Sequence, residues 1–96
     1  MLILVTYDVS TETTAGKKRL GKIAKKCVSY GQRVQNSVFE CNLDWSQFQV
    51  LQSELRAIIN TNEDSLRFYN LGNNYSEKVI HVGAKPSVNL EGELIV

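Results

Sequence analysis

The chain has 96 residues, of which 43% are hydrophobic and 22% are charged. This length corresponds to one domain, and this composition is typical of a soluble globular protein. No apolar run approaches the roughly 20 residues of a membrane span, and the N-terminal segment lacks the basic start and cleavage site of a signal peptide. We therefore expect a cytoplasmic protein with no membrane partner. Two isolated cysteines and a single histidine argue against the usual zinc sites.

The net charge of +1 hides an asymmetry along the chain. Residues 1–33 carry seven Lys or Arg against two acids, whereas residues 34–96 carry four against eight. A basic segment on an otherwise acidic body favours a polyanion bound on one face. The alternative is a solvated helix face that binds nothing.

The first predicted element is a strand over residues 2–8, which is apolar at consecutive positions like a strand buried on both faces. A polar loop is expected over residues 9–16. Helical spacing of apolar residues then predicts a helix over 17–30, which Gly31 would end in a left-handed conformation. The apolar residues of that helix are Leu20, Ile23, Ala24, Cys27 and Val28.

A second strand is predicted over residues 33–42. Asp44 can cap a second helix that runs to Ile59, with Gln47 completing a capping box. Two further strands are predicted over 65–71 and 78–82, because Gly72 and the two asparagines after it are typical of a hairpin turn.

Taken one by one, these elements run β-α-β-α-β-β. If the second strand bends back so that its two ends pair differently, or if the strands at 65–71 and 78–82 act as one unit, the order becomes β-α-β-β-α-β, allowing for the position of the hairpin. That order is typical of a ferredoxin-like α+β fold, an antiparallel four-stranded sheet with both helices on one face. We assign residues 1–82 to this domain and 83–96 to a tail. The face of the sheet opposite the helices would then be open, and a second subunit would cover it. Which residues lie on this face depends on the register of the strands. These residues include Tyr7, Phe39, Phe68 and Tyr69.

Asp8 is the carboxylate best placed for chemistry, at the mouth of the first strand and beside the basic segment. Mg²⁺ keeps several waters, so one or two carboxylates and a substrate phosphate suffice to hold it. Two copies of Asp8 across a twofold axis would supply two. A metal there could polarise a phosphodiester and lower the pKa of a bound water. The alternative is a strand-end residue that bonds to the following loop.

Arg19 and Arg33 are the arginines of the basic segment. Arginine can clamp a phosphate through two parallel hydrogen bonds, and either residue could lie near the end of the first strand. The alternative is two surface arginines that aid solubility. His81, inside the predicted strand 78–82, is expected to be structural rather than a catalytic base.

Four segments together resemble the small CRISPR-associated endonuclease family Cas2, in particular its type I-C branch. They are Leu-Val-Thr-Tyr-Asp-Val at 4–9, Gly-Gln-Arg-Val-Gln-Asn-Ser-Val-Phe-Glu at 31–40, Asp-Ser-Leu-Arg-Phe-Tyr-Asn-Leu-Gly at 64–72 and His-Val-Gly-Ala-Lys-Pro-Ser at 81–87. The resemblance covers essentially the whole chain, and the combination is specific although each piece alone is weak.

The resemblance implies a ferredoxin-like homodimer with its sheets face to face, in which a C-terminal strand at 93–96 extends the partner's sheet. It implies that Asp8 binds Mg²⁺, or Mn²⁺, shared between subunits. Arg33 and Phe39 would belong to the phosphate site, and Arg19 and Ser37 match less closely. The expected nucleic-acid-binding residues are Lys17, Lys18, Arg19, Lys22, Lys25 and Arg33.

The implied activity is metal-dependent endonucleolytic cleavage of double-stranded DNA or single-stranded RNA. It would serve CRISPR spacer acquisition and antiviral defence, together with the Cas1 integrase. A second hypothesis is a non-catalytic DNA-binding scaffold that bridges the integrase subunits. A third, an RNA-recognition module of similar topology, lacks the glycine pattern expected on the strand at 65–71.

Overall fold

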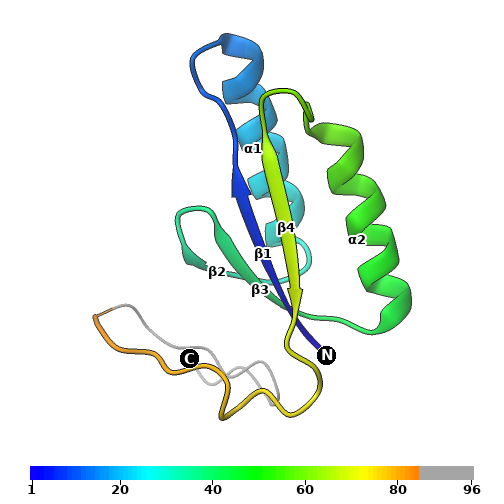
Figure 1. The fold of residues 1–96 in the computed structure, drawn as a ribbon, viewed down its shortest axis with the longest axis vertical. Coiled ribbons are helices and arrows are strands. Elements are labelled where there is room, and N and C mark those ends of the chain that lie inside the picture. Colours follow the sequence, from blue (N-terminus) through cyan, green and yellow to red (C-terminus); the bar gives the residue numbers. More distant parts are fainter. Residues whose placement is uncertain (85–96) are drawn as a thin grey trace.

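The computed structural model describes residues 1–84, which form four strands and two helices. In chain order they are β1 (Leu2–Asp8), α1 (Thr14–Val28), β2 (Gln32–Gln35), β3 (Val38–Asn42), α2 (Trp45–Ile58) and β4 (Ser65–Asn70). The strands form one sheet in the order β2-β3-β1-β4, and each neighbouring pair is antiparallel (Figure 1). The predicted ferredoxin-like α+β fold is confirmed.

The hydrophobic core lies between the sheet and the two helices. Alternate residues of β1 (Ile3, Val5 and Tyr7) point into it, as the two-residue period of a strand requires. The helices contribute to the same buried cluster, so both cover one face of the sheet. Their buried members are Ile23 and Cys27 from α1, and Phe48, Leu51 and Leu55 from α2.

The predicted second strand is in fact two strands, β2 and β3, joined by a turn at Asn36 and Ser37. The pairing register shifts between Arg33 and Gln35, and the Tyr7 amide donates to the Ser37 carbonyl at 3.1 Å. The chain therefore bends back within the predicted strand, which gives the order β-α-β-β-α-β. Asn36-Ser37 is a polar pair of a kind common in turns, and the prediction missed it because apolar residues stand on both sides of it.

Helix α1 begins three residues before the predicted start, because the Thr13 hydroxyl accepts a hydrogen bond from the Gly16 amide at 3.0 Å and caps the helix. The predicted left-handed conformation of Gly31 is wrong, since the positive φ angles among residues 1–84 belong to Gly72 and Gly83. Gly31 is needed for space instead. A side chain there would clash with the Glu40 carbonyl of β3.

Helix α2 confirms its predicted cap. The Asp44 carboxylate accepts from the Gln47 amide at 2.8 Å, and the Gln47 side chain accepts from the Asp44 amide at 3.0 Å. The helix ends at Ile58, one residue before the predicted end.

The strand predicted over 78–82 and the hairpin at Gly72 are wrong. Leu71 and Gly72 instead extend the pairing with Leu2, through two backbone hydrogen bonds of 2.9 Å. A turn then closes between Tyr75 and Lys78, and residues 79–82 have no strand pairing. The β-branched residues of this segment favour a strand only where a partner edge is available, and residues 1–84 bring none to it. The predicted strand at 93–96 lies outside the described residues.

The register also corrects the expected open face. Tyr7, Phe39 and Phe68 pack with the helix-side core, whereas Tyr69 lies on the opposite face. The aromatic residues therefore chiefly fill the core. In the part of the chain that the structure describes, no helix could cross a membrane.

Candidate functional site

Asp8 is the last residue of the central strand β1, and it stands opposite Ser65 of β4. Its neighbour Tyr7 faces the helices, so Asp8 points to the open face, together with Thr6 and Arg67. The side chain is exposed, and no other residue of 1–84 hydrogen-bonds or ion-pairs with its carboxylate. The loop bond required by the alternative interpretation of Asp8 is therefore absent from these residues, and the carboxylate is available for a ligand.

A single chain does not form a complete metal cage here. Among residues 1–84, no group of three or more His, Cys, Asp and Glu side chains could hold a metal ion. An exposed carboxylate at a strand end does supply the hard oxygen that Mg²⁺ and Mn²⁺ prefer. Asp8 thus fits a cation whose remaining ligands come from water, a phosphate or a second copy of the chain.

Arg33 and Phe39 meet in the structure, on the helix side of the sheet. The guanidinium carbon of Arg33 lies 5.2 Å from the ring centroid of Phe39, and the Tyr7 ring stacks on Phe39 at 6.3 Å. Burial raises the pKa of the Tyr7 phenol. The charge of Arg33 and a hydrogen bond from Arg33 act in the opposite direction and offset part of this rise. Phe39 is fully buried, so it serves as a platform for Arg33.

These contacts separate Arg33 from Asp8 within one chain. Arg33 touches the residue before Asp8, but from the helix side, while Asp8 points to the open face. Ser37 comes closer to the end of β1, because its carbonyl accepts from the Tyr7 amide at 3.1 Å. A phosphate held by Asp8 and Arg33 together would therefore have to lie at the edge of the sheet, or between two copies.

Arg19 is bound to acidic residues. Its guanidinium donates to Asp64 through Nε at 2.8 Å and through a terminal nitrogen at 3.3 Å, and to Glu63 at 3.0 Å. Only 16% of its side chain is exposed. Both acids come from the loop between α2 and β4, so Arg19 ties α1 to that loop.

Asp64 is a buried carboxylate that the sequence analysis did not single out. It accepts hydrogen bonds from the Ser10 amide at 3.2 Å and the Asn60 amide at 2.9 Å, in addition to those from Arg19. The Arg19 hydrogen bond is the main cause that holds the pKa of Asp64 below its ordinary value. Its position directly before a strand, after a polar loop, was the available signal.

The remaining cations of α1 divide into two groups. Lys26 pairs with Glu54 of α2 at 3.0 Å. Four exposed lysines, in contrast, have no acidic partner among residues 1–84. These four, which we call the lysine group, are Lys17, Lys18, Lys22 and Lys25.

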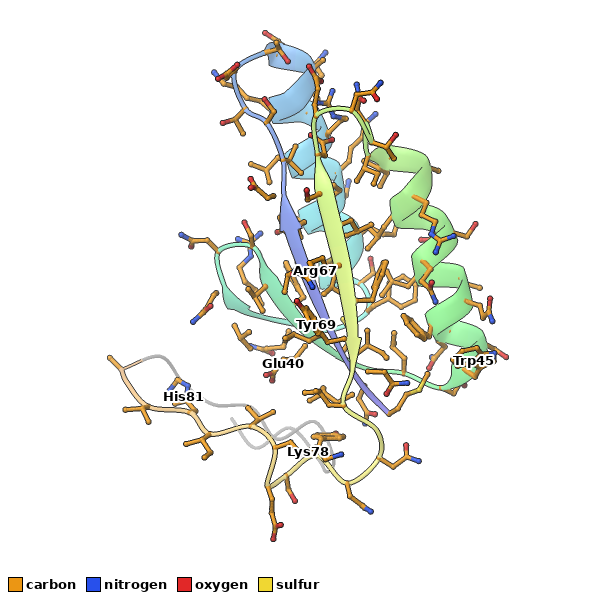
Figure 2. The ribbon with its side chains drawn as sticks, viewed as in Figure 1. Glu40, Trp45, Arg67, Tyr69, Lys78 and His81 are labelled. Atoms are coloured by element: carbon orange, nitrogen blue, oxygen red, sulfur yellow. The ribbon has the colours of Figure 1, made fainter. Side chains whose placement is uncertain are left out.

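Figure 2 shows further charged and aromatic side chains that the sequence analysis did not place in the site. Arg67 lies with its guanidinium carbon 5.2 Å from the Tyr69 ring centroid, on the face of Asp8. Burial raises the pKa of Glu40, and the charge of His81 opposes this. The two-residue alternation over 65–70 was the signal that would have assigned Arg67 to this face.

Comparison with known proteins identifies the family of this fold and site. The family model described as CRISPR associated protein Cas2 matches residues 1–79. The chain belongs to the Cas2 family. A solved structure of Streptococcus pyogenes Cas2 at pH 6.5 superposes with a TM-score of 0.77 at 54% identity, covering 86% of this chain and 100% of that one.

Two relatives match over nearly their whole length. The CRISPR-associated endonuclease Cas2 of Halalkalibacterium halodurans is 59% identical over 95 residues, which cover 99% of each chain. The CRISPR-associated endoribonuclease Cas2 of Chlorobaculum tepidum is 57% identical over 96 residues, which cover 100% of each. The two relatives thus carry different activity names, endonuclease and endoribonuclease, at similar identity to this chain.

Proposed function

We propose that this Cas2 chain is a CRISPR-associated endonuclease that hydrolyses phosphodiester bonds in double-stranded DNA or single-stranded RNA, with Asp8 as the ligand of Mg²⁺ or Mn²⁺. The observation that carries the proposal is the state of Asp8. It is an exposed carboxylate at the end of the central strand with no partner among residues 1–84. The endonuclease name of a relative that is 59% identical supports the same activity.

Asp8 fixes the place of the reaction, because it ends the central strand and its backbone pairs with Ser65 of β4. When bound there, a divalent cation supplies charge neutralisation at the phosphate and a bound water of lowered pKa. Arg67 lies on the same face and can donate to a phosphate oxygen near Asp8.

The lysine group would hold the flanking phosphate backbone. Its four side chains are exposed and carry no acidic partner within the described residues, so an approaching polyanion displaces no protein ion pair. Such contacts recognise charge and not sequence, and their strength falls steeply with salt.

The proposed active unit is a homodimer. One chain offers one carboxylate at the site, and a second copy across a twofold axis would offer another. The pair would supply the two carboxylates that, with water and phosphate, complete the coordination of Mg²⁺. Dimerisation would then create the metal site.

The decisive experiment is cleavage of labelled duplex DNA and labelled single-stranded RNA, with and without Mg²⁺ or Mn²⁺. Asp8→Asn is expected to reduce cleavage at least about 100-fold, as removal of a single charge-stabilising group does. Binding of the same nucleic acid, measured without metal, should stay within about twofold, since Asp8 is not among the phosphate-backbone contacts.

Glu12→Gln is the matched control, because it removes another exposed carboxylate from the loop that follows Asp8. Its cleavage should equal that of the native protein. Undiminished cleavage by rigorously purified Asp8→Asn protein would reject the endonuclease proposal.

A DNA-binding scaffold for the Cas1 integrase is the second candidate, and one observation favours it. Asp8 points away from the helices, whereas the lysine group is on α1, so backbone binding by the lysines does not require Asp8. If scaffolding is the essential role, spacer acquisition in cells survives Asp8→Asn and fails when the lysine group is changed to Glu. Loss of acquisition with Asp8→Asn alone would count against it.

A further inference from the structure

The backbone of Ser10, two residues after Asp8, is held from two sides. On one side its amide donates to the buried Asp64 carboxylate at 3.2 Å. On the other side Gly16 of α1 approaches so closely that an added side chain would clash with the Ser10 carbonyl oxygen. The loop that leaves β1 is thus fixed at a point two residues beyond the candidate metal ligand.

Asp64 is itself fixed by groups from three other parts of the chain. Its carboxylate has no exposed surface, and its oxygens accept from Arg19 of α1, from the Asn60 amide after α2 and from the Ser10 amide. A buried charge with this many donors has one favourable position, since any displacement leaves a donor unpaired. The next residue, Ser65, stands opposite Asp8 in the sheet.

We infer that Asp64 is a positioning residue for Asp8. It carries no exposed oxygen to offer a substrate, so it acts through Ser10 and the pairing of Ser65 with Asp8. Arg19 acts in the same unit, by orienting the Asp64 carboxylate, rather than as a phosphate clamp. The expected effect on metal binding by Asp8 rests on the proposed function. The expected effect on the mobility of the Asp8 backbone does not.

The test combines Asp64→Asn with a second, independent variant, Gly16→Ala. Asp64→Asn removes the negative charge to which Arg19 and the Ser10 and Asn60 amides donate. Gly16→Ala forces Ser10 away from α1 and leaves Asp64 unchanged. In the full-length protein, amide exchange of Ser10 should become at least tenfold faster in both variants. The ¹⁵N relaxation of Asp8 should show increased mobility, while amides in the middle of β3 stay unchanged.

Two controls separate positioning from general loss of stability. Glu63→Gln removes the exposed acid that also pairs with Arg19 but does not touch Ser10. Ile23→Val removes one buried methyl group from the centre of α1. Both should leave exchange at Ser10 and mobility at Asp8 within twofold of the native values, at a temperature well below every variant's Tm.

Mn²⁺ serves as the probe of the metal site, through the paramagnetic broadening of the Asp8 amide. The two positioning variants should need several-fold more Mn²⁺ than native protein for the same broadening, and Asp8→Asn should abolish the effect. Native protein with no broadening at Asp8 would count against the proposed function alone. If folded Asp64→Asn and Gly16→Ala proteins both keep native Ser10 exchange and native Asp8 mobility, the positioning role is overturned.

Discussion

The two sides of helix α1 use the same kind of charge in different ways. On the side toward α2 and its following loop, Arg19 and Lys26 are engaged by Glu63, Asp64 and Glu54. On the exposed side, the lysine group has no acidic partner among residues 1–84. The number of cations on a helix therefore overstates what a polyanion can bind. Pairing within the fold decides which cations build the structure and which remain for a ligand.

Charge reversal of the lysine group should give the largest effect. Changing all four lysines to Glu is expected to weaken DNA binding by at least about a thousandfold at low salt. In the native protein, four phosphate contacts would give a slope of log affinity against log salt of roughly −3.6. Fluorescence anisotropy with labelled duplex at several salt concentrations measures both quantities. Arg19→Gln is the matched comparison, and it should change the slope by less than one unit because Arg19 is already bound to acids.

The next largest effect is expected on stability, from removal of the buried Asp64 carboxylate. Asp64→Asn is expected to lower the free energy of unfolding at pH 7 by roughly 1–3 kcal/mol, since one carboxylate oxygen becomes an NH₂ group and the buried donors to that oxygen lose their acceptor. The pKa of Asp64 is lowered in the fold. Its stabilisation is therefore complete above the ordinary carboxyl pKa and is lost as the pH falls through the lowered value.

Urea unfolding of native and Asp64→Asn protein from pH 7 to pH 2.5 measures this difference. The difference in unfolding free energy between the two proteins should narrow progressively below about pH 4, the ordinary range of an aspartate pKa. A gap that stays constant with pH would mean that the charge of Asp64 contributes nothing.

Two glycines of the same helix should respond to alanine in opposite directions. Gly21 has no atom within 4 Å of an added side chain, so Gly21→Ala should stabilise the protein by up to about 1 kcal/mol through helix propensity. Gly16→Ala should destabilise it, because the Ser10 carbonyl occupies the space of the new side chain. Thermal unfolding of both variants measures the sign of each stability change. A stabilised Gly16→Ala protein would show that the Ser10 carbonyl moves aside at no cost.

The smallest expected effect concerns the two thiols of the interior. Burial raises the pKa of Cys27 to about 11 and that of Cys41 to about 12. At pH 8 both should therefore react with a thiol reagent such as DTNB far more slowly in native than in urea-unfolded protein. Colorimetric release kinetics measure this. Rapid reaction of Cys27 in the folded protein would indicate local unfolding at α1, and rapid reaction of Cys41 would indicate local unfolding at β3.

Much of the fold could be predicted because its signals are local. The apolar run of β1, the helical spacing around Ile23 and the capping box at Asp44 each depend on a few neighbouring residues, and all three agree with the structure. The Asn36–Ser37 turn lies between apolar residues that the prediction joined into one strand. The segment 78–82 has strand composition, but its structure depends on partners elsewhere, which composition does not reveal.

The candidate site was predictable in its residue types but not in its geometry. Asp8 stands out in sequence because it ends a buried strand, and its role as a metal ligand stays a prediction. The opposite orientations of Asp8 and Arg33 follow from sheet register, and the engagement of Arg19 by Asp64 joins residues 45 positions apart. Such long-range contacts leave no local pattern. The exposed charges therefore look alike in sequence, although the fold separates them.

The central place of β1 also has a consequence for synthesis of the protein. The strand is made first, yet its two neighbours in the sheet end at Asn42 and Asn70. During translation the edge of β1 that pairs with β4 would stay unpaired until most of the chain has left the ribosome, a period in which a growing chain is open to aggregation. Completion of the sheet on the β4 side would thus await residue 70, so a chain that ends before this residue should be recognised as incomplete by chaperones and proteases.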